Sequence, residues 1–271
     1  MKVPRRVSHL FAVMAIVFGA TLASAQSAQV GWNHNPASDK GPNFWGELTF
    51  PFATCGAGDP FVEVGKKQSP VDIVTKDAVK APLLPIVFKY KATPFVVENT
   101  GHVVEVPYEA GSSIQVGMNS YELLQLHVHA PSEHTVNGQL AEAELHLVHR
   151  DALLDVAVVG VLINVGSPVN PVIDEILRKA PSEEGEIELP GSVNAKDLLP
   201  RFDRRYYHYS GSLTTPPFSE GVRWFVLKDP VFVSQEAIDH LHEVIAEFPG
   251  YEGYPNNNRP VRPLNGRVIL K

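Results

Sequence analysis

Short runs of apolar and β-branched residues, about four to eight residues long, dominate the chain from residue 69 onward and are typical of β-strands. The runs are rich in Val and Ile and are separated by Gly, Pro or Asn. One of them, 156–163, is almost entirely apolar and predicts a central strand buried on both faces. The predicted strands are 86–90, 95–98, 103–106, 113–116, 123–129, 144–149, 156–163 and 222–227.

Helical periodicity occurs in two segments. Residues 171–180 begin with Pro171, a residue favoured in the first helical turn, and place three branched apolar side chains on one face. Residues 234–248 begin with Ser234, a favoured N-cap, and carry an apolar stripe at helical spacing. The chain has no internal repeat and no linker-like stretch after residue 70. We therefore expect a loop-rich, mainly β fold in a single domain.

The first 25 residues have the three parts of a secretory signal peptide. Basic residues precede an uncharged apolar run at 10–22, and small residues follow up to Ala25. The run is shorter than the roughly 20 residues that span a bilayer, although an N-terminal membrane anchor stays open as an alternative. We expect cleavage after Ala25, location in the periplasm or outside the cell, and a mature domain of residues 26–271 with no membrane contact.

Charge and cysteine content narrow the possible partners. The net charge of the full chain is −7, and removal of the three basic residues of the signal leaves −10. Such an acidic chain lacks the clustered Lys and Arg that phosphate contacts need, which excludes nucleic acid as a partner. Cys55 is the single cysteine, so no disulfide can form within the chain. Pairing of Cys55 with another chain and assembly into a homodimer both stay open.

Five of the eleven histidines lie between residues 127 and 149. Successive strand side chains point to opposite faces, so His127 and His129 project together from their strand. His146 lies on the next predicted strand, and antiparallel pairing of the two strands could bring three imidazoles to one point. Three neutral imidazoles with one open position are typical of a catalytic zinc site.

The same alternation places Gln125 beside His127 and Glu144 beside His146. Metal-bound histidines commonly donate their second N–H group to an amide, a carboxylate or a carbonyl, so both residues are candidate partners of the ligands. For four other histidines we expect structural or solvent-facing positions. These are His134 and His149 (structural or exposed), and His240 and His242 (solvent-facing).

Seven blocks of sequence, taken together and in order, resemble the α-class carbonic anhydrases over about residues 32–271. The resemblance does not depend on any single motif, because all seven blocks occur in the family's order. They are QSPVDI (68–73), NTGH (99–102), LLQLHVHAPSEH (123–134), AELHLVH (143–149), YSGSLTTPP (209–217), EGVRW (220–224) and NNRPVRPLNGR (257–267).

The resemblance implies a fold and an activity. The fold is a large, twisted, mostly antiparallel central sheet of about ten strands with a few surface helices, and a conical cleft reaches the middle of the sheet. The activity is reversible hydration of carbon dioxide to bicarbonate and a proton, by attack of a zinc-bound hydroxide and with a histidine as proton shuttle. Zn²⁺ is the implied cofactor, and carbon dioxide and bicarbonate are the implied small-molecule partners.

The resemblance also implies a role for individual residues. The implied zinc ligands are His127, His129 and His146. The implied partners of these ligands are Gln125, Glu144 and the backbone carbonyl of Asn257. The implied catalytic residues are His102 as the proton shuttle and Thr214 with Glu133 as its carboxylate partner. The implied substrate-binding residues are Thr214, Thr215, Val148, Val158, Leu213, Val222 and Trp224.

The chain departs from the family's pattern at three positions. His34 stands where the family often has a tyrosine in the cleft, and Glu105 stands where an amide is common. Phe218 stands where many bacterial relatives have the second cysteine of a disulfide, so that bond cannot form. We note that His34 could assist proton transfer.

Two alternative interpretations of the histidine cluster remain. His127-x-His129-x3-Glu133 matches the metal-binding core of cupin-like enzymes, but the flanking glycines of that motif are absent at Tyr121 and Leu140. A catalytically silent zinc-binding protein on the same fold is the other alternative. Silent relatives usually lack a ligand histidine, and this chain retains all three.

Overall fold

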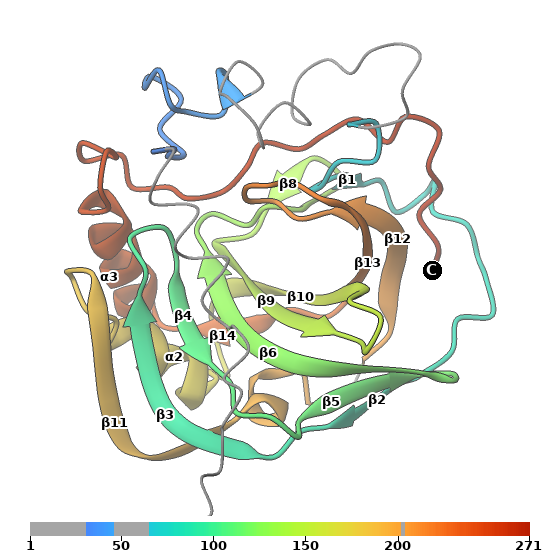
Figure 1. The fold of residues 1–271 in the computed structure, drawn as a ribbon, viewed down its shortest axis with the longest axis horizontal. Helices are drawn as coiled ribbons and strands as arrows, with labels where there is room; N and C mark the ends of the chain where they lie inside the picture. Colours follow the sequence, from blue (N-terminus) through green and yellow to red (C-terminus); the bar gives the residue numbers. More distant parts are fainter. Residues whose placement is uncertain (1–30, 46–64, 202–203) are drawn as a thin grey trace, which may run out of the picture. The chain divides into compact units, whose positions relative to one another are not determined.

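The computed structural model describes residues 31–45, 65–201 and 204–271. These residues form a large sheet and a small one (Figure 1). The strands of the large sheet are β2 (Ile86–Lys89), β3 (Ala92–Asn99), β4 (Val104–Pro107), β5 (Ser113–Val116), β6 (Asn119–His129), β9 (Ala143–Arg150), β10 (Val156–Val165), β11 (Gly185–Asn194), β12 (Tyr206–Ser212), β13 (Glu220–Leu227) and β14 (Val231–Val233). The small sheet contains β1 (Asp72–Ile73), β7 (Thr135–Val136) and β8 (Gln139–Leu140).

The main path of the large sheet runs β11–β3–β4–β6–β9–β10–β13–β12, and β5, β2 and β14 pair beside this path. Strand β10 is parallel to β13 and to β14, and the other pairs of the sheet are antiparallel. The predicted fold class, mainly β with a mostly antiparallel central sheet, is therefore confirmed. Strand β10 lies between β9 and β13 and is buried over most of its length, as its apolar sequence predicts.

All eight strands predicted from periodicity are present, and three further strands of the large sheet were not predicted from it. Strand β11, GEIELPGSVN, is an edge strand that contains two glycines, a proline and two glutamates. Edge strands tolerate such residues because one of their sides needs no hydrogen-bond partner, and for the same reason their sequences lack a clear β pattern.

A bulge interrupts the alternation of β6. Leu123 pairs with His149 and Gln125 pairs with Val148, so the register against β9 shifts by one residue at Leu124. An extra residue in one strand reverses which face the following side chains occupy. The alternation predicted for Gln125 to His129 lies beyond the bulge and is confirmed.

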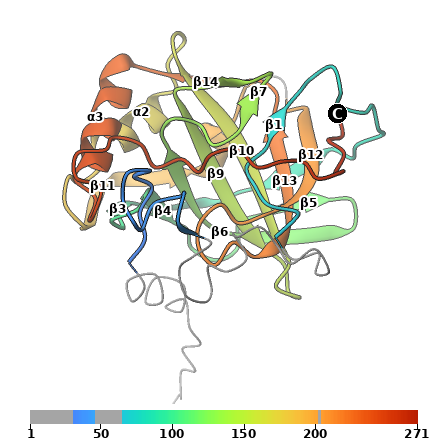
Figure 2. The same ribbon diagram turned by 90° about the horizontal axis from the view of Figure 1, so that it is seen from above.

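Two helices cover one face of the sheet. Helices α2 (Pro171–Arg178) and α3 (Gln235–Ala246) lie within the two predicted segments, contact each other, and appear side by side in Figures 1 and 2. Their apolar faces share one buried cluster with strand residues such as Leu126 and Leu145. Since these leucines alternate with the ligand candidates along β6 and β9, the helices and the histidines occupy opposite faces of the sheet.

The signal peptide predicted at 1–25 and Cys55 lie outside the described residues. Within the part of the chain that the structure describes, no helix combines the length and the apolar composition that a membrane span requires.

Candidate metal centre

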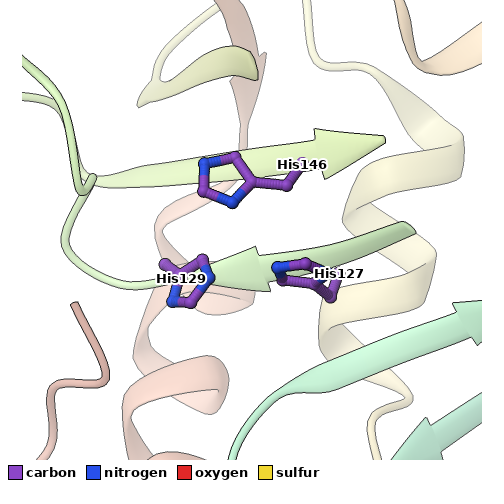
Figure 3. A group of neighbouring side chains, drawn as sticks. All are labelled: His127, His129 and His146. Atoms are coloured by element: carbon purple, nitrogen blue, oxygen red, sulfur yellow. The ribbon is translucent and has the colours of Figure 1, made fainter. Parts of the chain in front are cut away.

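Strands β6 and β9 bring the three predicted ligands together in the middle of the large sheet (Figure 3). His127 is the register partner of His146, and His129 is the partner of Glu144. The centroid of the His127 ring lies 5.0 Å from that of His129 and 5.3 Å from that of His146. The centroids of the His129 and His146 rings are 4.9 Å apart. One nitrogen from each ring lies within 4.8 Å of the others, which is close enough to share one metal ion.

In each of the three rings, the nitrogen that points away from the other two rings faces the residue predicted to orient that ligand. His127 Nδ1 is 2.8 Å from Gln125 Oε1, and His129 Nδ1 is 2.8 Å from the backbone oxygen of Asn257. His146 Nε2 lies 3.1 Å from Glu144 Oε1. These contacts leave Nε2 of His127, Nε2 of His129 and Nδ1 of His146 for the metal, because each ring uses its other nitrogen to fix its orientation.

The environment keeps two of the ligands neutral, which metal binding requires. Burial lowers the pKa of His127 well below its usual value, and the neighbouring His129 lowers it further. Burial likewise lowers the pKa of His129, against the opposing effect of the Glu133 carboxylate. His129 Nε2 is buried and has no hydrogen-bond partner among the described residues. An unpaired buried imidazole nitrogen in this position fits a zinc ligand.

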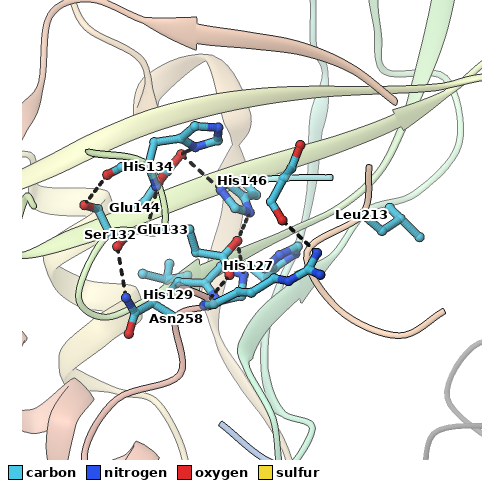
Figure 4. Close-up of polar contacts among 12 residues, drawn as sticks. His127, His129, Ser132, Glu133, His134, Glu144, His146, Leu213 and Asn258 are labelled. Carbon is cyan, nitrogen blue, oxygen red and sulfur yellow. Dashed lines mark hydrogen bonds and ion pairs between the residues drawn. The ribbon is translucent and has the colours of Figure 1, made fainter. Parts of the chain in front are cut away.

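Glu144 contacts the ligand His146 and also binds His134 and the backbone of residues 133 and 134 (Figure 4). Its carboxylate is buried and accepts hydrogen bonds from His134 Nδ1 at 2.7 Å and from the backbone N–H groups of Glu133 and His134 at 3.0 and 2.8 Å. Burial raises the pKa of Glu144, but His134 and His146 lower it more, so the net shift is well below the usual value.

His134 and Glu144 could also form a metal-binding group with His146. In the structure, however, the three residues are joined to one another by contacts of 2.7 and 3.1 Å, and His134 Nε2 lies 2.7 Å from Tyr209 Oη. His134 is hydrogen-bonded to Glu144 and to Tyr209, so the group is a polar network behind the ligands in which Glu144 also contacts His146. The structural role expected for His134 agrees with this position.

Glu133 and Thr214 approach the site from different elements. Glu133 is fully buried, its Oε1 accepts a hydrogen bond from the backbone N–H of Arg259 at 2.9 Å, and its Oε2 lies 3.7 Å from His129 Nε2. Thr214, on the loop between β12 and β13, is 5% exposed. Among the described residues no hydrogen bond joins Thr214 to Glu133, and Glu133 Oε2 has no hydrogen-bond partner. The contact between Thr214 and Glu133 therefore stays a prediction.

The five residues predicted to form an apolar wall belong to one hydrophobic cluster beside the histidines. Val158 is the register partner of both Val148 and Trp224, and the Trp224 ring lies 4.9 Å from the His146 ring. Thr215 is partly buried in the same loop as Thr214. The cluster members from the predicted set are Val148, Val158, Leu213, Val222 and Trp224.

The predicted proton shuttle, His102, lies outside the ligand set and against Trp32. The two rings are stacked, with centroids 4.2 Å apart and planes at 8°. Burial lowers the pKa of His102 to about 4 in this position. Asn257 Nδ2 donates a hydrogen bond to the backbone oxygen of His102 at 3.0 Å, so the residue that holds His129 also holds the loop of His102.

His34 is deeply buried near the same rings. Its Nδ1 lies 2.6 Å from Tyr251 Oη, and its ring centroid is 6.4 Å from that of His129. Burial lowers the pKa of His34 well below its usual value, with a further contribution from His129. Tyr251 and Arg259 were missed by the sequence reasoning as parts of this site. Each is more than 100 residues from its partner, and no local pattern marks such contacts.

The structural position predicted for His149 is confirmed, whereas His240 and His242 are less exposed than predicted. His149 is fully buried on the opposite face from His146, where its Nε2 lies 2.7 Å from Tyr90 Oη. His240 and His242 are half-buried, and each ring bonds a backbone carbonyl of a neighbouring segment, at 3.1 and 2.6 Å. The helical pattern predicted solvent-facing rings because it carries no information about these neighbouring segments.

Comparisons with known proteins give a consistent family assignment. A model of the family described as eukaryotic-type carbonic anhydrase matches residues 40–271. A carbonic anhydrase of a Nostoc species is 35% identical over 265 residues, which cover 96% of this chain and 93% of the relative. A carbonic anhydrase of Neisseria gonorrhoeae is 35% identical over 99% of this chain and 98% of the relative.

Solved structures give the same result for the fold. The α-carbonic anhydrase of Thermovibrio ammonificans, in complex with sulfanilamide, is 40% identical, with a TM-score of 0.79 over 89% of this chain and 99% of that protein. Dioscorin complexed with ascorbate is 28% identical, with a TM-score of 0.76 over 89% of this chain and 97% of that protein. The second likeness shows that the fold alone does not identify the ligand.

Proposed function

The chain belongs to the eukaryotic-type, or α-class, carbonic anhydrase family, and from that premise we propose which of its residues bind the metal and carbon dioxide, orient the attacking oxygen and transfer the proton. The activity is the reversible conversion of carbon dioxide to bicarbonate and a proton. The family uses zinc, and His127, His129 and His146 supply a donor set that fits it. When bound, zinc supplies a nucleophilic hydroxide near neutral pH by lowering the pKa of its water ligand.

The apolar cluster beside His146 is the proposed substrate wall. Carbon dioxide has no net dipole, so it gains nothing from polar partners and is best held by apolar side chains. Support comes from Val148, Val158 and Trp224, which lie on adjacent strands and face the same side of the sheet as the ligands. Leu213 and Val222 complete the wall from β13 and its preceding loop.

Thr214 and Glu133 are proposed to orient the attacking oxygen. Glu133 Oε1 is already held by the Arg259 N–H, whereas Glu133 Oε2 is buried and needs a donor. We assign that donor to the Thr214 hydroxyl. A hydroxyl that donates to Glu133 can only accept from the attacking oxygen, and this demand aims the oxygen's free electron pair at the substrate. Thr215 lies beside the substrate in this assignment.

His102 is proposed to carry the proton away. A ring stacked on Trp32 with a pKa of about 4 stays neutral at pH 7 and can accept a proton only when water reaches it. We therefore propose that half-buried His102 transfers the proton through water. His34, held by Tyr251, is the competing candidate for this step.

The observation that carries the proposal is the convergence of three oriented imidazoles from β6 and β9. The test is stopped-flow carbon dioxide hydration with and without a zinc chelator, on the wild type, His146→Ala and the control His242→Ala. We expect one zinc per chain, near-complete loss of zinc and activity in His146→Ala, and normal values in the control. Full zinc occupancy and normal hydration by His146→Ala would contradict the assignment, and zinc binding without hydration in the wild type would favour the silent alternative.

Export and assembly form a separate part of the proposal. The signal pattern of residues 1–25 supports release of a mature chain into the periplasm or the medium. N-terminal sequencing of the exported protein is expected to begin at Gln26, and an intact N-terminus in the membrane fraction would favour the anchor. Light scattering of the mature chain distinguishes the homodimer from the monomer.

A further inference from the structure

The loop that carries Thr214 is closed at its base and anchored by one aromatic side chain. Leu213 N–H donates to the backbone oxygen of Ser219 at 3.0 Å, which joins the two ends of the loop. Inside the loop, Phe218 N–H donates to the backbone oxygen of Thr215 at 2.9 Å. Phe218 is fully buried, whereas Pro217 next to it is exposed. Phe218 is thus the largest buried side chain of the loop.

The backbone of Phe218 adopts a conformation that its side chain must stabilise. Its φ is +59°, in the left-handed region that residues other than glycine rarely occupy. The Phe218 ring lies 5.0 Å from the Trp45 ring, and the guanidinium carbon of Arg259 lies 4.4 Å from its centroid. Gln68 Nε2 donates to the Phe218 backbone oxygen at 3.1 Å. A cation held over an aromatic face is attracted more strongly in dry surroundings, so these contacts fix the ring and its backbone.

Arg259 connects this anchor to Glu133. Its Nη1 donates to Gln68 Oε1 at 2.9 Å and to the backbone oxygen of Ser69 at 2.7 Å, so its guanidinium is held in place over Phe218. Its own backbone N–H donates to Glu133 Oε1 at 2.9 Å. One buried residue therefore touches both the anchor of the Thr214 loop and the carboxylate that Thr214 is proposed to face.

We propose that Phe218 is a positioning residue for the hydration reaction: through its contact with Arg259 it sets the position of the Thr214 hydroxyl relative to Glu133. The inference rests on the roles proposed above for Thr214 and Glu133. Loss of the ring leaves the closed base of the loop intact but lets the segment around Thr214 shift. A displacement of about 1 Å in a catalytic group can cost about 100-fold in rate.

The test is a double-mutant cycle on the zinc-loaded full mature chain, with Phe218→Leu, Thr214→Ala and the double variant. Phe225→Leu is the matched control, because Phe225 is equally buried on β13 but its ring packs against Tyr206 and His208, away from the site. We expect Phe218→Leu to lower kcat/KM by about 10- to 100-fold with zinc content unchanged, and Phe225→Leu to stay within about twofold of wild type. Thr214→Ala should lower kcat/KM, and Phe218→Leu should add little further loss to it.

A second readout does not depend on activity. Amide hydrogen exchange of the zinc-free protein should rise over 213–219 in Phe218→Leu and stay unchanged there in Phe225→Leu. If Phe218→Leu does not fold, Phe218→Met takes its place in the cycle, since methionine fills the volume without an aromatic face.

The outcomes distinguish failure of the positioning role of Phe218 from failure of the role proposed for Thr214. A loss in Thr214→Ala combined with a fully additive effect of Phe218→Leu would overturn the positioning role alone. Unchanged kcat/KM in Phe218→Leu, with or without lower stability, would also overturn it. Full activity of Thr214→Ala would contradict the role proposed for Thr214, and with it the route by which Phe218 acts.

Discussion

Glu144→Gln tests how far the site depends on a carboxylate that no substrate touches. Glu144 Oε1 faces His134 Nδ1 at 2.7 Å and His146 Nε2 at 3.1 Å, while Oε2 accepts from the backbone N–H groups of Glu133 and His134. Glutamine replaces one of these oxygens with an NH₂ group. In one orientation the NH₂ group faces the two backbone N–H donors, and in the other it faces His134 Nδ1, whose hydrogen-bond role depends on the tautomer of the ring.

The expected loss of stability in Glu144→Gln follows from the number of buried donors that lose their acceptor. Each buried donor left without an acceptor costs about 1–3 kcal/mol, so one or two of them lower the free energy of unfolding by about 1–6 kcal/mol. Loss of the partner that orients a ligand typically weakens metal binding by about 10- to 100-fold, and here the freed ligand is His146. We therefore expect a protein that still folds, binds zinc more weakly and loses activity when zinc is limiting.

Two measurements check this expectation, zinc competition with a chelator of known affinity and urea unfolding. The matched control is Glu122→Gln on the neighbouring strand β6, whose exposed carboxylate accepts one hydrogen bond from Gly111 N–H at 2.9 Å. The control should change the unfolding free energy by less than about 0.5 kcal/mol and leave zinc affinity unchanged. Wild-type zinc affinity in Glu144→Gln would refute the reasoning, because the orientation of His146 would then not depend on Glu144.

Three further predictions concern proton transfer, substrate attack and acid stability. His102→Ala should lower kcat more than kcat/KM, and imidazole buffer should restore the rate; if His34→Ala shows this behaviour at low buffer instead, the shuttle is His34. Glu133→Gln should keep its zinc but lose about 100- to 1,000-fold in kcat/KM, because an amide can donate to Thr214 and reverse its hydroxyl, and wild-type kinetics would leave Glu133 a structural role. Burial lowers the pKa of His149 from 6.5 to about 3. As the pH falls below 6.5, His149 is therefore protonated in the unfolded chain but stays neutral in the folded protein. Stability should therefore decrease by about 2 kcal/mol from this residue between pH 7 and pH 5, His149→Gln should remove that part of the decrease in urea unfolding, and equal pH dependence in both proteins would contradict the prediction.

The ligand triad could be predicted because strand geometry is local. His127 and His129 are two residues apart after the bulge at Leu124, so they must share a face whatever the strand pairs with. That His146 lies directly opposite His127 depends on the register of β6 and β9, which periodicity does not contain. The seven family blocks supplied this information in the sequence reasoning, and the register agrees with them.

The partners that come from distant segments could not be predicted in the same way. Asn257 reaches His129 across 128 residues and Arg259 reaches Glu133 across 126, and neither contact leaves a periodic trace. Asn257 was identified through the resemblance, whereas Arg259 and Tyr251 were not identified at all. Burial is the physical reason: these side chains are placed by packing of the C-terminal segment over the sheet, which depends on the whole fold.

The balance of charge within the site gives a further argument for a divalent cation. Glu144 is fully buried but accepts three hydrogen bonds, and although burial lowers the pKa of His146, Glu144 raises it more. Glu133 is fully buried beside His129, whose pKa burial lowers, and its Oε2 has no hydrogen-bond partner among the described residues. Buried carboxylates are costly unless a positive charge or several donors compensate them. The guanidinium of Arg259 is directed at Gln68 and the Ser69 carbonyl, and only the backbone N–H of Arg259 reaches Glu133. A doubly charged ion held by the three imidazoles would therefore compensate the Glu133 carboxylate, and removal of zinc should lower the free energy of unfolding as well as abolish activity.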